Sequence, residues 1–140
     1  YSNEPIDVSK VIKMVLIHDI VEIDAGDYIV YTKDTSEKEE KEIAAALRIF
    51  CILPEEQKEE LIGLWREFEE RKTPEAKFAA AIDRLEPVMQ NYFTEAYAWR
   101  ENNIKSEQIL SVNKRIEYGS EKLWHYAKAL IEECIEKKLI

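Results

Sequence analysis

Apolar residues recur at intervals of three and four along most of this chain, which is the spacing of one face of an α-helix. The first such stretch starts at residue 8, and Gly26 stands where its helix would end. Pro54 and the pair Thr73-Pro74 mark two further starts, because proline is favoured in the first turn of a helix. The pattern predicts helices over about 8–23, 36–53, from 54 onward, 73–92, 106–118 and 121–138.

The low content of chain-breaking residues supports an all-α fold. The 140 residues include 3 glycines and 4 prolines, fewer than a β-sandwich with its many turns needs. Residues 28–35 carry β-branched and aromatic side chains but have no partner strand in the pattern, so we interpret them as an extended loop. We therefore expect residues 1–140 to form a single domain, a bundle of about five or six helices.

The charge and the cysteine content of the chain limit which partners the protein can bind and in which compartment we expect it. The formal net charge of −9 gives no basic surface for duplex nucleic acid or an anionic membrane. No apolar run reaches membrane-spanning length, and the first residues are polar, unlike a signal peptide. Cys51 and Cys134 lie in apolar stretches without metal-binding spacing, which predicts buried free thiols in a reducing cytoplasm. A phosphate substrate would need a metal ion or local basic groups to offset the repulsion.

The pair His18-Asp19 is the first candidate site, because it interrupts the apolar stretch M-V-L-I-H-D-I-V. Burying an unpaired charge costs several kcal/mol, so a partner must compensate, and a divalent cation suits imidazole and carboxylate ligands. Glu22 lies one helical turn beyond His18 and can face the same region. The alternative is an ordinary histidine satisfied in the core, with the aspartate bonded to nearby backbone.

Asp83 is the second candidate. It follows the small residues Ala79, Ala80 and Ala81, which let their helix approach another backbone closely. An aspartate at this position could reach a metal ion held by the first helix. The alternative is a solvent-facing carboxylate paired with Arg84 or Lys77, and spacing alone does not separate the two.

Three segments together resemble the HD-domain phosphohydrolases, especially the subgroup that includes the bacterial 5′-deoxynucleotidases. The segments are L-I-H-D-I-V-E-I-D-A-G-D, T-P-E-A-K-F and A-I-D-R-L-E-P, and the resemblance covers about residues 8–95. It implies the helical HD fold and a divalent metal ion, either Mn, Co, Mg or Fe. It also implies hydrolysis of a nucleoside 5′-monophosphate or a similar small phosphate ester, and a homodimer.

The resemblance assigns roles to individual residues. His18, Asp19 and Asp83 correspond to metal ligands. Glu22 corresponds to a carboxylate that orients or deprotonates the attacking water. Asp27 corresponds to one that binds the sugar hydroxyl or assists the leaving group.

One ligand of the family pattern has no counterpart in these residues. The family has a further histidine on a helix before the His-Asp pair, whereas this sequence has no histidine before His18. We expect that ligand to lie before Tyr1 or to have been lost. The other histidine, His125, lies in the last amphipathic helix and is interpreted as a packing residue.

Two alternatives to a nucleotidase remain open at this point. The first is an enzyme of the same fold with another substrate: a nucleotide pyrophosphatase, a cyclic-nucleotide diesterase or a phosphonate oxygenase. The second is a helical interaction module with a vestigial site, which the missing histidine and the helices that carry Trp65, Trp99 and Trp124 support. Aromatic residues at helical spacing are more often core or dimer interface, so the tryptophans alone do not discriminate. Metal content separates the second alternative from an active enzyme.

Overall fold

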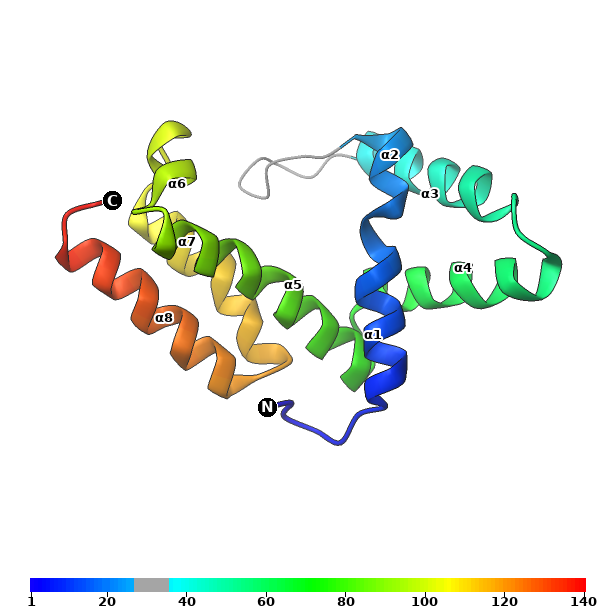
Figure 1. The fold of residues 1–140 in the computed structure, drawn as a ribbon, viewed down its shortest axis with the longest axis horizontal. Helices are drawn as coiled ribbons and strands as arrows, with labels where there is room; N and C mark the ends of the chain where they lie inside the picture. Colours follow the sequence, from blue (N-terminus) through cyan, green and yellow to red (C-terminus); the bar gives the residue numbers. More distant parts are fainter. Residues whose placement is uncertain (27–35) are drawn as a thin grey trace.

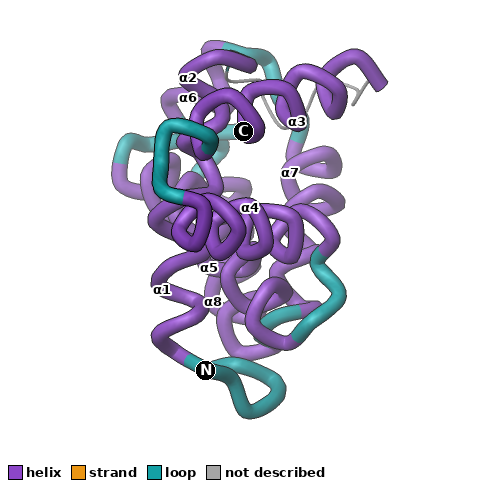
Figure 2. Tube along the Cα trace, turned by 90° about the vertical axis from the view of Figure 1, so that its right-hand side faces the viewer, coloured by secondary structure: helices purple, strands orange, loops and turns teal. Residues whose placement is uncertain are grey.

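The computed structural model describes residues 1–26 and 36–140. Its elements, in chain order, are α1 (Val8–Ile17), the 3₁₀ turn η1 (His18–Val21), α2 (Glu22–Ala25), α3 (Ser36–Phe50), α4 (Glu55–Glu70), α5 (Pro74–Phe93), α6 (Tyr97–Glu101), α7 (Ser106–Asn113), the 3₁₀ turn η2 (Lys114–Tyr118) and α8 (Glu121–Glu136). Within the described ranges there is no strand, and short turns join most helices (Figure 2). The α-helices of eight residues or more are α1, α3, α4, α5, α7 and α8, which confirms the predicted all-α fold.

The first predicted helix, over 8–23, differs from the structure at its functional end. Asp7 caps α1, and its carboxylate accepts hydrogen bonds from the N–H groups of Ser9 (2.9 Å) and Lys10 (3.2 Å). However, α1 ends at Ile17, and the chain tightens into η1 before the short α2. Gly26 then ends α2 with a φ of 85°, a conformation that favours glycine. The tighter turn therefore falls on the His-Asp pair.

α5 joins two clusters of buried apolar side chains. The first cluster lies among α1, η1, α2, α3, α4 and the start of α5; the second lies among the rest of α5 and α6, α7, η2 and α8. Figure 1 shows α5 running from α1 and α4 toward α7 and α8. Ala76 and Ala79 are buried in the first cluster, and Ala81 is buried in the second. The small residues thus allow the close approach that the sequence predicts.

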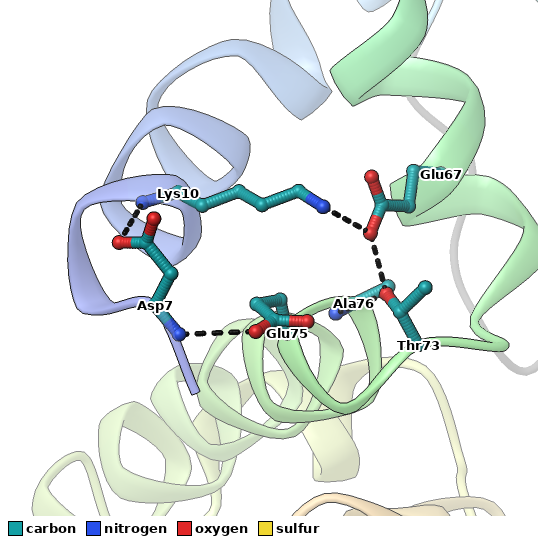
Figure 3. Close-up of polar contacts among 6 residues, drawn as sticks. All are labelled: Asp7, Lys10, Glu67, Thr73, Glu75 and Ala76. Carbon is teal, nitrogen blue, oxygen red and sulfur yellow. Dashed lines mark hydrogen bonds and ion pairs between the residues drawn. The ribbon is translucent and has the colours of Figure 1, made fainter. Parts of the chain in front are cut away.

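Polar contacts fasten α1, α4 and α5 to one another near their ends (Figure 3). Glu67 of α4 accepts from the Lys10 ammonium at 2.7 Å and from the Thr73 hydroxyl at 2.6 Å. The same hydroxyl caps α5 by accepting from the Ala76 N–H at 3.2 Å. The T-P-E segment therefore links α4 and α5 at their junction through side-chain hydrogen bonds.

The first seven residues connect to both halves of the molecule. The Asp7 N–H donates to Glu75 at 3.0 Å, at the start of α5. The Asn3 N–H donates to the Gly119 carbonyl at 3.0 Å, and the Asn3 side chain accepts from the Glu121 N–H at 2.8 Å. This segment therefore caps α8 while it leads into α1.

Two predictions about individual side chains were wrong. Cys134 is buried as predicted. Cys51 is exposed, because α3 ends at Phe50 and Cys51 lies in the turn that follows. His125, interpreted as a packing residue, is exposed on α8, whose buried side chains are the neighbouring Trp124 and Ala127. Among the described helices, none has both the length and the apolar composition that crossing a membrane requires.

Candidate metal centre

Three of the predicted side chains, two from η1 and one from α5, converge on one point. The His18 Nε2 lies 2.9 Å from the Asp19 Oδ1 and 3.0 Å from the Asp83 Oδ1, although Asp83 is 65 residues away in the sequence. One ligand atom from each of the three residues lies within 4.8 Å of the others. This contact favours the interpretation of Asp83 as a residue that reaches the first helical segment over that of a solvent-facing carboxylate.

The His18 ring is held in one orientation from two sides. Its Nδ1–H donates to the Val15 carbonyl at 2.9 Å, and its ring centroid lies 4.5 Å from that of Phe68 on α4. With Nδ1 engaged in this way, Nε2 is the atom that faces the carboxylates. A metal-binding histidine has the same arrangement, in which a hydrogen bond at one ring nitrogen orients the other toward the ion.

Exposure differs sharply within the group. The side chain of His18 is 10% exposed, whereas those of Asp19 and Asp83 are 66% and 37% exposed. The sequence predicted a partly buried His-Asp pair, which is right for His18 and wrong for Asp19. The imidazole is therefore packed against the core while the Asp19 carboxylate faces solvent, so that a small ligand can approach from the Asp19 side.

The electrostatics of His18 favour a positive charge at this point. Burial is the largest single influence and lowers the pKa of His18. The hydrogen bond to Asp83 and the charges of Asp19 and Asp83 outweigh it, so the pKa lies above the ordinary value of 6.5. The two carboxylates thus stabilise a cation at Nε2, either a proton or a metal ion, and the two compete.

The donor set fits a divalent metal ion. It combines one imidazole nitrogen with two carboxylate oxygens, ligands that suit Mn²⁺, Co²⁺ and Fe²⁺, and it contains no thiolate. The nitrogen is oriented before any ion arrives, because its partner atom is bonded to backbone.

Of the two predicted catalytic carboxylates, Glu22 and Asp27, only Glu22 lies within the described residues. Glu22 begins α2, is half-buried, and donates its N–H to the Asp19 carbonyl, but its side chain is not one of the three converging groups. Asp27 and the predicted loop over 28–35 lie outside the described residues. The roles of Glu22 and Asp27 stay predictions.

Several residues around His18 were missed by the sequence analysis. Phe68 was expected only as core, yet its ring contacts the imidazole. Burial raises the pKa of the Glu69 carboxyl, and the charges of Arg71, Glu42, Lys38 and His18 make smaller contributions. These residues come from long charged stretches, where no local signal distinguishes a residue near the site from one on a solvated face.

The three tryptophans do not form a partner-binding surface. Trp65, Trp99 and Trp124 are all buried, the first in one apolar cluster and the other two in the second. Their packing role accounts for them, so the tryptophans give no support to the interaction-module alternative.

Comparison with known proteins places these observations in a family. The family model described as HD domain matches residues 1–124. The 5′-deoxynucleotidase HDDC2 of Dictyostelium discoideum is 38% identical over 106 residues, which cover 74% of this chain and 56% of that protein. The human protein of the same name is 33% identical over 91 residues, which cover 63% of this chain and 44% of that protein. The chain thus spans about half the length of these curated relatives.

A solved structure matches along the entire chain. It is the crystal structure of a protein from Magnetospirillum magnetotacticum MS-1, described as a predicted metal-dependent phosphohydrolase. The TM-score is 0.92 at 41% sequence identity, and the match covers 100% of this chain and 70% of the other. The helical arrangement around His18 and Asp83 is therefore shared with that protein.

Proposed function

The chain belongs to the HD domain family, and on that basis we propose that residues 1–140 form one HD domain of a metal-dependent phosphohydrolase. The observation that carries the proposal is the convergence of the His18 imidazole with the Asp19 and Asp83 carboxylates. As substrate we propose a nucleoside 5′-monophosphate, in particular a deoxynucleotide, or a similar small phosphate ester. The names of the Dictyostelium and human relatives support this choice.

His18, Asp19 and Asp83 would hold the divalent ion. The HD phosphohydrolases that the sequence resembles use a fourth ligand, a histidine on an earlier helix, and the described residues offer no histidine before His18 for that role. When bound, the ion supplies a Lewis acid for the phosphoryl group and lowers the pKa of water, so that hydroxide is available near neutral pH. Its charge also offsets the repulsion between a phosphate and a protein with a net charge of −9.

The chain's own carboxylates would move the protons. Glu22 accepts the proton of the water that attacks phosphorus, while the bond between phosphorus and the ester oxygen breaks. The leaving alcohol takes up a proton, and Asp27 assists that step or binds the sugar hydroxyl. The products are the nucleoside, or another alcohol, and inorganic phosphate. The half-buried position of Glu22, at the end of η1 and next to the ligands, supports its role.

A substrate panel tests the proposed activity. With Mn²⁺ or Co²⁺ supplied, we expect phosphate release from deoxynucleoside and ribonucleoside 5′-monophosphates, and no release after chelation of the metal. Nucleoside triphosphates, cyclic nucleotides and a phosphonate serve as the matched alternatives. Turnover of one of these alone would replace the proposed reaction. A protein that binds no divalent ion and releases no phosphate would contradict it.

We also propose that the protein is a cytoplasmic homodimer, as the family resemblance implies. The apolar side chains Trp124, Ala127 and Ile131 of α8 are buried within the chain, so these three are not available to an interface. Sedimentation velocity is expected to give the mass of two chains at micromolar concentration. A single-chain mass that persists as the concentration rises would contradict the dimer.

A further inference from the structure

Phe68 is a core residue that also contacts one of the proposed metal ligands. It lies in the last turn of α4, is 2% exposed and belongs to the first apolar cluster. Its ring centroid is 4.5 Å from that of the His18 imidazole, and the two rings are tilted by 45°. Aromatic pairs prefer offset or tilted arrangements to a face-to-face stack. The contact therefore joins two rings in a way that an aliphatic side chain of similar size does not reproduce.

The hydrogen bond at Nδ1 fixes only part of the orientation of the imidazole. The Nδ1–H donates to the carbonyl of Val15, three residues earlier in the same segment, at 2.9 Å. A ring held at one atom can still tilt about that bond, and the tilt would move Nε2 away from Asp19 and Asp83. Phe68 comes from another helix and packs on the ring itself, so it restricts this tilt. The two contacts together keep Nε2 at 2.9 Å and 3.0 Å from the two carboxylate oxygens.

The turn that carries Phe68 is fastened by the neighbouring residue. Glu67 accepts from the Lys10 ammonium of α1 at 2.7 Å and from the Thr73 hydroxyl, which caps α5, at 2.6 Å (Figure 3). These contacts hold the end of α4 and do not involve His18. The Phe68 ring is therefore a support whose position is set independently of the imidazole that it contacts.

The ring contact also favours a positively charged imidazole. The face of an aromatic ring attracts a cation within about 6 Å of its centroid, and the attraction is stronger where water is excluded. The imidazole centroid lies within that range of the Phe68 ring, and the His18 side chain is only 10% exposed. An imidazole that binds a divalent ion through Nε2 shares part of the charge of the ion. Phe68 should therefore stabilise the metal-bound form of His18 more than the neutral, metal-free form.

We propose that Phe68 is a positioning residue of the metal centre, whose ring directs the His18 Nε2 toward the ion and raises the affinity of the site for it. This inference rests on the proposed function, and it adds to the three ligands a residue that does not itself bind the ion. Phe50 offers a comparison within the chain. It is 1% exposed in the same apolar cluster, and within the described ranges no ring contact joins it to His18.

The test compares Phe68→Leu with Phe50→Leu, each of which removes one buried ring from the same cluster. For Phe68→Leu we expect the dissociation constant for Co²⁺, measured by calorimetry at a fixed pH, to rise about tenfold or more, because outer partners of metal ligands are worth about 10–100-fold in affinity. Phe50→Leu should be less stable in chemical denaturation but keep the wild-type affinity. Phe68→Tyr retains a ring and should restore most of the affinity. Phe68→Met replaces the leucine variant if that variant does not fold.

A second measurement uses the metal-free protein. The exchange of the His18 Nδ1–H with water, followed by NMR, reports how firmly the imidazole is held against the Val15 carbonyl. We expect this hydrogen to exchange several-fold faster in Phe68→Leu than in wild type, because the ring has lost its support. In Phe50→Leu the exchange should match that of wild type.

The outcomes separate this inference from the proposed function. Wild-type Co²⁺ affinity in Phe68→Leu, or an equal loss of affinity in Phe50→Leu, would overturn the inference and leave the hydrolase proposal standing. Weaker Co²⁺ binding in Phe68→Leu alone, with no phosphate release by the wild-type protein, would support the inference and contradict the hydrolase. If the wild-type protein bound no ion, the proposed metal centre and the role of Phe68 in it would both be wrong, whatever the exchange of the Nδ1–H.

Discussion

Replacing Asp19 with asparagine is expected to lower metal-dependent phosphate release by more than about 100-fold, while the fold stays intact. The substitution removes the carboxylate charge beside the His18 Nε2, where its oxygen lies at 2.9 Å. Even the outer partners of metal ligands are worth about 10–100-fold in metal affinity or activity, and a direct ligand is worth more. The side chain is 66% exposed, so the core loses no packing. Phosphate release and bound metal, measured together, check the result.

Asp24→Asn is the matched control for this experiment. Asp24 lies on the adjacent α2 and forms an exposed ion pair with Arg48, away from the three converging ligand atoms. Losing an exposed ion pair costs little, so we expect activity within about twofold of wild type. Thermal unfolding monitored by circular dichroism shows whether both variants fold. A folded Asp19→Asn protein with wild-type activity would remove Asp19 from the site.

Replacing Gly119 with alanine is expected to destabilise the protein by about 3 kcal/mol, at the upper end of the usual cost of overpacking. A Cβ at this position would lie 2.2 Å from the Lys77 carbonyl oxygen and 2.8 Å from the Phe78 Cα. Both are backbone atoms of α5, which cannot shift without disturbing the helix that carries Asp83. The φ of Gly119 is −97°, which any residue can adopt, so the effect comes from space alone. Chemical denaturation measures the loss, and we expect the Tm to fall by roughly 10 °C.

Gly63→Ala is the corresponding control. Gly63 lies inside α4, and nothing is within 4 Å of a Cβ built there. Alanine in an exposed helix position is favoured over glycine by about 0.5–1 kcal/mol, so this variant is expected to be slightly more stable than wild type. If both alanine variants had the same free energy of unfolding as wild type, the close approach of Gly119 to α5 would be wrong.

Local signals in the sequence were sufficient for most helix boundaries. Thr73 and Gly26 act through hydrogen bonds or backbone angles within a few residues of themselves, and the structure confirms each as a helix end. Apolar spacing identified the buried faces of the long helices for the same reason. The resemblance to HD phosphohydrolases then pointed to His18, Asp19 and Asp83, which the structure brings together.

Features that depend on distant parts of the chain could not be predicted in this way. The apolar pattern continues through His18, so it gave no sign of the 3₁₀ turn that ends α1. Phe68 meets the His18 ring only because α4 packs against α1, which leads into η1. Lys38 and Glu42 look like many other charges on α3 until α3 is placed against α2. The exposure of Asp19 likewise depends on which side of η1 the core covers.

The most direct test of the proposed metal centre is the amount of divalent ion bound per chain, measured as a function of pH by equilibrium dialysis. We expect about one ion per chain at pH 8. Binding should weaken as the pH falls through the raised pKa of His18, because below that pKa the proton occupies Nε2 and must be displaced. The ion should be absent from His18→Ala at any pH. Failure of the wild-type protein to bind an ion, or equal binding by the His18→Ala protein, would contradict the assignment of His18, Asp19 and Asp83 as the metal centre.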